Sequence, residues 1–138
     1  MSQENVEIVK RAVAAFEQGL DAALPFYDPE VTWEEAKDEP DGETFQGHGG
    51  LRALLRKWLV PFDDLRVEPE EFIEAGEAVV MPYLFRGRER SSGRDITGPE
   101  TWVFWLRDGR IREVREYRDK GEALEAVGLS EQDAHGDS

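Results

Sequence analysis

Residues 100–119 read ETWVFWLRDGRIREVREYRD and predict the β-hairpin around which the rest of the chain is arranged. The central Asp108-Gly109 pair favours a two-residue turn of type I′, because both central residues of that turn need positive φ. Counting outward from the turn, without a bulge, gives the expected opposed pairs: Leu106 with Ile111, Phe104 with Glu113, Trp102 with Arg115, and Glu100 with Tyr117. Alternate residues of a strand share a face, so these eight side chains are expected on one side of the sheet.

Both faces of this hairpin are partly apolar. The first face is aromatic but also carries Glu100, Glu113 and Arg115. The opposite face has apolar residues of its own: Val103, Trp105 and Val114. A hairpin that is apolar on both faces is expected to be covered on both. We therefore expect one face to line a core and a pocket, and the outer face, with Pro82 and Leu84 beside it, to form a homodimer interface.

The composition limits the class of protein. The chain has 138 residues, enough for one domain, and its hydrophobic fraction of 39% can supply a core. A formal net charge of −14 argues against nucleic acid or an anionic membrane as a partner, since both need clustered Lys and Arg. There is no cysteine for a disulfide framework and no apolar run of membrane-spanning length. The acidic N-terminus lacks the apolar region of a signal peptide, so a cytoplasmic protein is expected.

Helical patterns come before strand patterns along the chain. In chain order, the expected elements are helices at 2–18 and 21–27, a short strand at 31–35, an acidic loop at 36–46, a helix that opens at 47–50, strands at 65–74 and 79–90, the hairpin, and a helix at 120–127. The strand at 65–74 is expected to be bulged near Pro69, where the period-two alternation breaks. Helices first and a meander after them predict an α+β fold, with one curved sheet wrapped on the N-terminal helices.

Four pieces of the sequence, in this order and spacing, resemble the SnoaL-like branch of the nuclear transport factor 2-like superfamily. They are FYDPEVTW at 26–33, GHGGLR at 47–52, WLRDGRI at 105–111 and EYRDKGEALEAVG at 116–128. The resemblance covers residues 3–128, so a single domain over 1–128 is expected. The polar residues 129–138 after it are expected to form a disordered tail. The resemblance also implies a conical half-barrel, with a curved mixed or antiparallel sheet and an apolar pocket open at one end, that dimerises through the outer sheet face. Its members include isomerases, cyclases, dehydratases, epoxide hydrolases and domains without catalysis, so the fold does not select a function.

The branch is similar in fold to ketosteroid isomerase, and the resemblance places Glu34-Glu35 where that enzyme keeps its general base. The enzyme also needs a tyrosine on the first helix and a protonated acid on the penultimate strand. Those positions fall here at roughly Ala12 and Thr101, and neither residue supplies the required hydrogen bond. Steroid isomerisation in that form is therefore not expected.

Three side chains are candidate catalytic groups. Glu35 beside Trp33 would be a carboxylate against an aromatic wall, a setting that suits a general base, unless it is an exposed acid of the following loop. Tyr83 would donate a hydrogen bond to a ligand, or else pack in the core. Arg115 would orient a carboxylate or a carbonyl group, or instead form an internal ion pair.

The predicted ligand-binding residues are those expected to face or flank the same cavity: Trp33, His48, Trp58, Phe85, Glu100, Trp102, Phe104 and Tyr117. The two histidines, His48 and His135, are not at metal-ligand spacing, so neither a metal nor another cofactor is expected. We expect a protein that binds a small apolar or amphipathic molecule. It would either carry out cofactor-free acid–base chemistry on a carbonyl compound, as an isomerase, cyclase or hydratase, or serve as a non-catalytic binding or dimerisation module.

Overall fold

The computed structural model describes residues 2–36 and 42–130, and the helices precede the long strands as the sequence predicts. The helices are α1 (Ser2–Ala15), α2 (Leu20–Ala23), α3 (Gly47–Leu59) and α4 (Lys120–Ala126), with 3₁₀ helices η1 (Phe16–Gln18) and η2 (Leu24–Phe26). The strands are β1 (Tyr27–Glu34), β2 (Thr44–Gln46), β3 (Phe62–Pro69), β4 (Ile73–Ala75), β5 (Ala78–Glu89), β6 (Asp95–Arg107) and β7 (Arg110–Tyr117).

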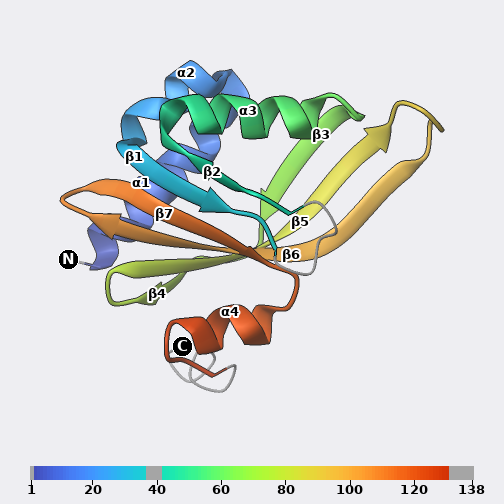
Figure 1. Ribbon diagram of the computed structural model, residues 1–138. Helices are drawn as coiled ribbons and strands as arrows, with labels where there is room; N and C mark the ends of the chain where they lie inside the picture. Colours follow the sequence, from blue (N-terminus) through green and yellow to red (C-terminus); the bar gives the residue numbers. More distant parts are fainter. Residues whose placement is uncertain (1, 37–41, 131–138) are drawn as a thin grey trace.

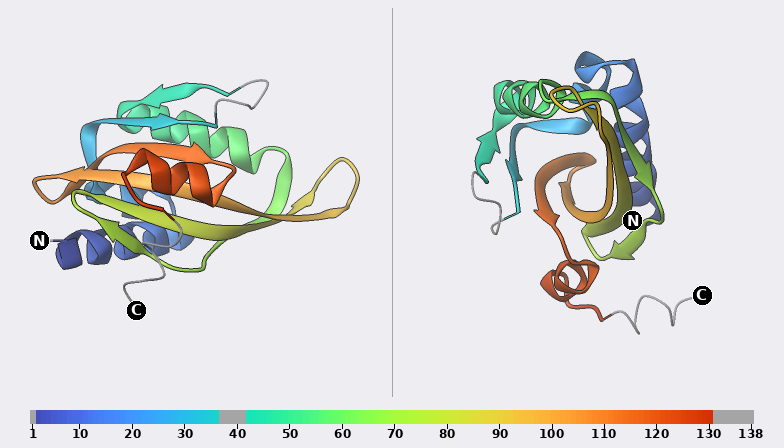
Figure 2. Two further views of the ribbon diagram at one scale, coloured as in Figure 1. Left: turned by 90° about the horizontal axis from the view of Figure 1, so that it is seen from below. Right: turned by 90° about the vertical axis from the view of Figure 1, so that its right-hand side faces the viewer.

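The strands form one seven-stranded sheet in the order β2-β1-β7-β6-β5-β3, with β4 paired to β5. β1 and β7 run parallel, and the other paired strands run antiparallel. The sheet is curved and unclosed; the N-terminal helices lie on one side of it and α4 on the other (Figures 1 and 2). We call the face that packs against α1–α3 the inner face. The predicted α+β fold, a curved mixed sheet around N-terminal helices, is confirmed.

The turn of the central hairpin has the predicted conformation. Asp108 has φ 53° and Gly109 has φ 79°, and the flanking Arg107 and Arg110 are paired. Two consecutive residues with positive φ define a type I′ turn, whose twist matches that of the flanking strands.

A β-bulge in β7 shifts the register beyond the turn. Leu106 pairs with Ile111, as predicted, but Trp105 pairs with Glu113, so Arg112 is one extra residue in β7. Because side chains alternate with period two, one inserted residue moves every later side chain of β7 to the opposite face.

The bulge corrects the predicted faces of the hairpin. Trp102 stands opposite Glu116 rather than Arg115. Arg115 lies over the ring of Trp105, 5.3 Å from its centroid, on the outer face. Tyr117 packs in the outer cluster too. The prediction that Arg115 and Tyr117 share a face with Trp102 is therefore wrong.

The inner face and helices α1–α3 share the main hydrophobic core. Val6, Val9 and Ala12 of α1 are buried at the spacing of one helical stripe. Trp33 of β1 and Phe104 of β6 are fully buried beneath them and have no exposed surface.

The outer face is covered in part by α4 of the same chain. Val80 and Val103 are fully buried in a second cluster with Leu124 of α4, and Trp105 packs against it. Apolar residues that the sequence assigned to a subunit interface are thus partly covered within the chain. Val114, assigned to the same interface, lies instead in the inner core because of the bulge.

The remaining differences concern short or polar segments. β2 falls inside the predicted acidic loop, of which residues 37–41 lie outside the described part of the chain. The predicted strand at 65–74 is two strands, β3 and β4. Pro69 pairs with Tyr83 and Ile73 with Val80, so this segment has one residue more between the two pairs than β5 has. One extra residue is what a bulge near Pro69 requires. The predicted tail lies outside the described residues from 131 onward, and Leu129 packs against the outer cluster.

Candidate functional site

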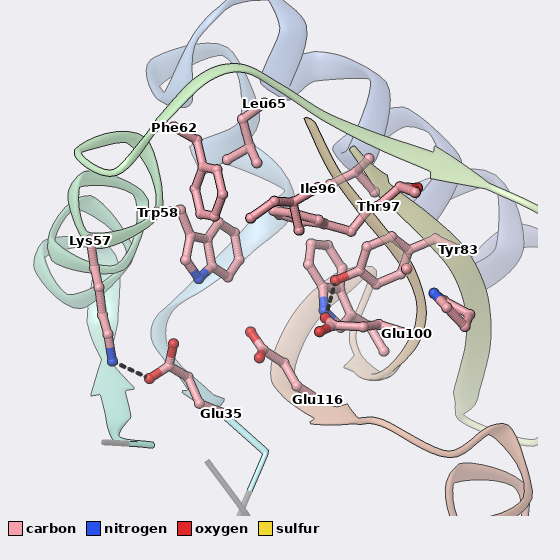
Figure 3. A pocket seen from close by; sticks show the side chains of 15 residues that line it. Glu35, Lys57, Trp58, Phe62, Leu65, Tyr83, Ile96, Thr97, Glu100 and Glu116 are labelled. Atoms are coloured by element: carbon pink, nitrogen blue, oxygen red, sulfur yellow. Dashed lines mark hydrogen bonds and ion pairs between the residues drawn. The ribbon is translucent and has the colours of Figure 1, made fainter. Parts of the chain in front are cut away.

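A cavity of about 430 Å³ opens between α3 and the inner face of the sheet (Figure 3). That volume is in the range of pockets that hold small organic molecules. Its apolar wall includes Trp58 of α3 together with Phe62, Leu65 and Ile96. Its charged and hydroxyl-bearing side chains are Glu35, Lys57, Tyr83, Thr97, Glu100 and Glu116.

Trp102 is the centre of the aromatic wall. Its ring stacks on Trp58 with centroids 5.6 Å apart and planes 15° apart. Tyr83 packs on it at 4.6 Å, and Trp33 meets it edge-on at 4.9 Å. Aromatic rings in contact at these distances hold one another in place, so the wall is rigid before any ligand enters.

The three glutamates come from neighbouring strands. Glu116 is on β7 and Glu100 on β6, while Glu35 directly follows β1. Glu34, the last residue of β1, pairs with Arg115 of the parallel strand β7. Glu35 and Glu116, the next residue on each side, therefore lie alongside each other. Figure 3 shows the three carboxylates on one side of the cavity, with Glu116 between Glu35 and Glu100.

Glu35 is held in place through one of its two oxygens. Its Oε1 lies 2.6 Å from Nζ of Lys57 and accepts a hydrogen bond of 3.2 Å from the backbone N–H of Glu43. The Glu35 side chain is only 8% exposed, so this ion pair is sheltered from water. Both contacts use Oε1, and in Figure 3 the other oxygen points away from Lys57 toward Trp58.

Tyr83 and Glu100 form a second polar pair. They face each other across β5 and β6, and the Tyr83 hydroxyl donates a 2.7 Å hydrogen bond to Oε1 of Glu100. Burial raises the pKa of Tyr83 well above its ordinary range, and the charge of Glu100 adds to this. Tyr83 is therefore a neutral hydrogen-bond donor at physiological pH.

The indole N–H of Trp102 is buried without a hydrogen-bond partner of good geometry. Its interaction with the Tyr83 hydroxyl lowers the pKa of that group, against the larger effect of burial, which raises it. Trp102 is 2% exposed, and an unpaired donor at such depth costs free energy. Trp102 lines the cavity, while its indole nitrogen is itself buried.

Glu116 is fixed from behind by the core. The indole N–H of Trp33 donates a 2.6 Å hydrogen bond to its Oε2. Trp33 itself does not line the cavity and has no exposed surface. The fully buried indole thus positions a carboxylate at the cavity wall, and this hydrogen bond exists only because the bulge turns Glu116 inward.

The predicted site residues divide between the cavity and other places. Those that line the cavity are Glu35, Trp58, Tyr83, Phe85, Glu100 and Trp102. Phe104 and Trp33 lie behind it in the core. His48 donates a 3.0 Å hydrogen bond from Nε2 to the carbonyl oxygen of Tyr27, which ties the start of α3 to β1 and does not line the cavity.

Arg115 does not reach this cavity. Its Nε lies 2.6 Å from Oε2 of Glu113 and 3.9 Å from Oε2 of Glu34. It borders a second, outer hollow with Tyr117, and Glu35 and Glu116 line both this hollow and the cavity. Arg115 and Glu35 do line a common hollow, the second one, but the expectation that Arg115 lies in the aromatic cavity beside Trp102 is corrected. Its physical cause is the extra residue in β7.

Sequence reasoning missed Glu116 and Lys57. Nothing in the sequence marks the bulge that turns Glu116 inward. Lys57 could have been found, because it lies next to Trp58 near the end of α3, where a lysine stem can follow the helix surface toward a carboxylate. Thr101, which the family pattern aligned with an acid, faces outward, whereas its neighbour Glu100 faces the cavity.

Metal-binding clusters and membrane-spanning helices are both absent from the described residues. In residues 2–36 and 42–130, no group of three or more His, Asp or Glu side chains is arranged to hold a metal ion. No helix in that part of the chain has the length and apolar character needed to cross a membrane.

Comparison with known proteins places this geometry in a family. The family model of the SnoaL-like domain matches residues 9–114, most of the chain. The chain belongs to the SnoaL-like domain family. The match spans all of β1 and β5–β6, and reaches β7 as far as Val114. No curated protein matches this SnoaL-like chain in sequence.

Solved structures similar to this SnoaL-like protein support the same fold. An NTF2-like protein of unknown function from Burkholderia pseudomallei is 26% identical, with a TM-score of 0.76 over 94% of this chain and 100% of the other. TerC, co-crystallised with polyporic acid, is 23% identical, with a TM-score of 0.75 over 90% and 97% of the two chains. A protein with a ketosteroid isomerase-like fold from Catenulispora acidiphila, in complex with trimethylamine, is 18% identical, with a TM-score of 0.71 over 89% and 93%.

Proposed function

We propose that the cavity binds a small, largely apolar carbonyl compound and moves a proton on it without a cofactor. The observation that carries this proposal is the state of Glu35. One oxygen is fixed by Lys57 at 2.6 Å, the side chain is 8% exposed, and the other oxygen points into an aromatic cavity. A carboxylate that is paired with an ammonium group through one oxygen and shielded from water suits a general base.

The indole N–H of Trp102 is the donor that we assign to the carbonyl oxygen. The Tyr83 hydroxyl beside it is neutral, but its one proton already goes to Glu100, so its role is to hold that carboxylate in place. Donors that are fixed in advance stabilise negative charge as it develops on an oxygen. Trp102 would take the place of the tyrosine and the protonated acid of ketosteroid isomerase, whose positions fall here at roughly Ala12 and Thr101.

The proposed step is a simple proton transfer. Oε2 of Glu35 takes a proton from the carbon next to the carbonyl group, the C–H electron pair forms the enolate C=C bond, and the carbonyl oxygen gains the negative charge near Trp102. Return of the proton to another carbon of the conjugated system gives an isomer. Attack of the enolate carbon on a second carbonyl group of the same molecule gives a ring, with a proton returned to the new alkoxide.

The test is hydrogen–deuterium exchange at the α-carbon of a ketone in D₂O, followed by proton NMR with 2-tetralone as the probe. Wild-type protein should accelerate the exchange over buffer. Glu35→Gln should lower that acceleration about 100-fold or more, the usual contribution of a general base. Glu34→Gln is the matched control, because Glu34 borders the outer hollow and does not line the cavity. Equal loss in both variants, or no acceleration by wild type, would contradict the proposal.

The second candidate is a binding protein without catalysis. It is favoured by one observation: Glu35, Glu100 and Glu116 each already hold a contact within the protein, to Lys57, Tyr83 and Trp33. Binding of 2-tetralone with no acceleration of exchange would support this alternative. Two similar solved structures hold polyporic acid and trimethylamine, which agrees with a small organic molecule in either case.

Homodimerisation through the outer sheet face also remains part of the proposal. Trp105 is partly exposed beside the α4 cluster and carries Arg115 over its ring. Trp105→Glu should lower the mass seen in light scattering if this surface joins two copies. A wild-type protein that is monomeric at high concentration would exclude the dimer.

A further inference from the structure

A second β-bulge lies in β3, on the side of the cavity next to the end of α3. Asp63 pairs with Arg88 and Arg66 with Arg86, so β3 has one residue more between these pairs than β5 has. Asp64 has φ 53°, a left-handed conformation that aspartate adopts more readily than most residues. The extra residue of β3 is therefore accommodated at Asp64.

The bulge gives the cavity an apolar side chain in place of a charged one. Phe62, which pairs with Glu89, lines the cavity. In a regular strand Asp64, two residues further on, would share the face of Phe62. In this structure Asp64 is exposed, and Leu65 lines the cavity together with Phe62. We call the pair Phe62 and Leu65 the β3 wall.

Gly87 of β5 leaves the space that the β3 wall fills. It follows Tyr83 and Phe85 at the alternate positions of β5 that face the cavity, and it is buried. A Cβ atom at Gly87 would lie 3.1 Å from Cδ1 of Phe62 and 3.4 Å from Cδ1 of Leu65. A side chain at position 87 would therefore push the β3 wall away from the sheet, into the space of the cavity.

The β3 wall and the carboxylates lie at different ends of the cavity. Figure 3 shows Phe62 and Leu65 at one end, and Glu35 and Glu116 toward the other. In the proposed reaction the carbonyl group and the carbon that loses a proton lie near Trp102 and Glu35. The hydrocarbon part of the bound molecule then extends toward the β3 wall.

We propose that Phe62 and Leu65 are specificity-determining residues, whose position over Gly87 limits the size of the hydrocarbon group that a ligand carries opposite its carbonyl group. This inference rests on the proposed function, because it describes the substrate of the same cavity. A larger residue at position 87 narrows the cavity, and a smaller residue at position 62 widens it. An apolar wall of this kind discriminates about 10-fold or more between groups that differ by as little as one methylene.

The experiment compares two ketones that differ in the size of the group opposite the carbonyl, 4-methylcyclohexanone and 4-phenylcyclohexanone. Isothermal titration calorimetry with the full chain gives the affinity of each. Gly87→Val should weaken binding of the phenyl compound relative to the methyl compound by at least about 10-fold, because the displaced β3 wall takes up space. Phe62→Ala should change the same ratio by at least about 10-fold in the opposite direction.

A double variant and a control test whether Phe62 and Gly87 act on each other. Gly87→Val combined with Phe62→Ala should return the affinity ratio toward that of wild type, because the missing ring leaves room for the valine. Phe72→Ala is the matched control, since Phe72 is half-buried against the main core and does not line the cavity. This control should leave the ratio unchanged.

The outcomes separate this inference from the proposed function. Circular dichroism shows whether each variant folds; if Gly87→Val does not, Gly87→Ala takes its place, with a smaller shift in the same direction expected. An unchanged ratio in folded variants, or equal changes in Phe62→Ala and Phe72→Ala, overturns the β3 wall as a determinant of specificity while the cavity remains a binding site. Failure of both ketones to bind wild-type protein overturns this inference together with the binding role of the cavity.

Discussion

Trp102 stands opposite Glu116 across β6 and β7, in the place that an unbulged hairpin would give to Arg115. The difference of one residue changes the chemistry of the cavity. An inward Arg115 would make it a site for anions, whereas the inward Glu116 adds a third carboxylate to those of Glu35 and Glu100. The bulge at Arg112 is therefore the feature that sets the polarity of the site.

The shifted register predicts opposite results at adjacent positions. Val114 has no exposed surface, so Val114→Lys should prevent folding or cost more than about 3 kcal/mol, because it buries an unpaired charge. Arg115→Met should change the free energy of unfolding by less than about 1 kcal/mol, since that side chain is 42% exposed and its ion pairs are screened by water. Urea denaturation measures both. If Val114→Lys were tolerated and Arg115→Met were strongly destabilising, the result would support the register without the bulge.

The type I′ turn can be tested at Gly109. Its φ of 79° is strained for a β-branched residue, although a Cβ atom at this position would have no neighbour within 4 Å. Gly109→Val should lower stability by about 1–3 kcal/mol, and Gly109→Asn by clearly less, because Asn tolerates positive φ. Equal melting temperatures for the Val and Asn variants would mean that backbone strain at this position is unimportant.

Two buried tyrosines predict a loss of stability at alkaline pH. Burial raises the pKa of both Tyr27 and Tyr83 above that of an unfolded tyrosine, which is about 10. Below pH 10 both states keep these protons; above it the unfolded chain releases them and the folded chain does not. The free energy of unfolding should therefore fall with rising pH by up to about 1.4 kcal/mol per pH unit for each tyrosine.

Tyr27→Phe separates this effect from general alkaline damage. The Tyr27 hydroxyl is buried without a partner, so its removal should leave stability at pH 7 unchanged or raise it by about 1 kcal/mol. The variant should also lose stability less steeply than wild type in urea unfolding between pH 9 and 11. The same slope in both proteins would show that Tyr27 is not neutral and buried in the way described.

The contact between α4 and the outer face predicts a further pair of results. Leu124 has no exposed surface and packs on the cluster with Val80 and Val103, so Leu124→Ala should cost about 2–4 kcal/mol. Glu125→Ala, one residue along on the exposed side, should change stability by less than about 0.5 kcal/mol. Chemical denaturation measures both variants. If Leu124→Ala lost no more stability than Glu125→Ala, the packing of α4 on the outer face would not contribute to stability.

Local signals predicted the fold well. The helical stripe of α1, the Asp108-Gly109 turn and the alternation of β5 each depend on residues close together in the sequence, so period and turn chemistry are enough to find them. β2 was missed because its three residues follow a long acidic stretch and have no alternation of their own.

The candidate site was predicted only in part, because it depends on register. Glu35, Tyr83, Glu100 and Trp102 line the cavity as expected. Glu116 was assigned to the wrong face, since an inserted residue leaves no mark in a pattern that is apolar on both faces. The contact between α4 and the outer face joins segments that are distant in sequence, and no local pattern predicts that they pack together. The apolar outer face was therefore assigned to a contact with a second copy of the chain.

The most direct test of the cavity as the ligand site is the indole N–H region of an ¹⁵N–¹H NMR spectrum during titration with 2-tetralone. The four tryptophans give separate signals, and Trp102→Phe and Trp105→Phe variants assign two of them. The signal of Trp102 should move as its unpaired N–H gains the ketone oxygen as acceptor, while that of Trp105, on the outer face, stays in place. Bound 2-tetralone with an unmoved Trp102 signal, or a shift confined to Trp105, would contradict the account.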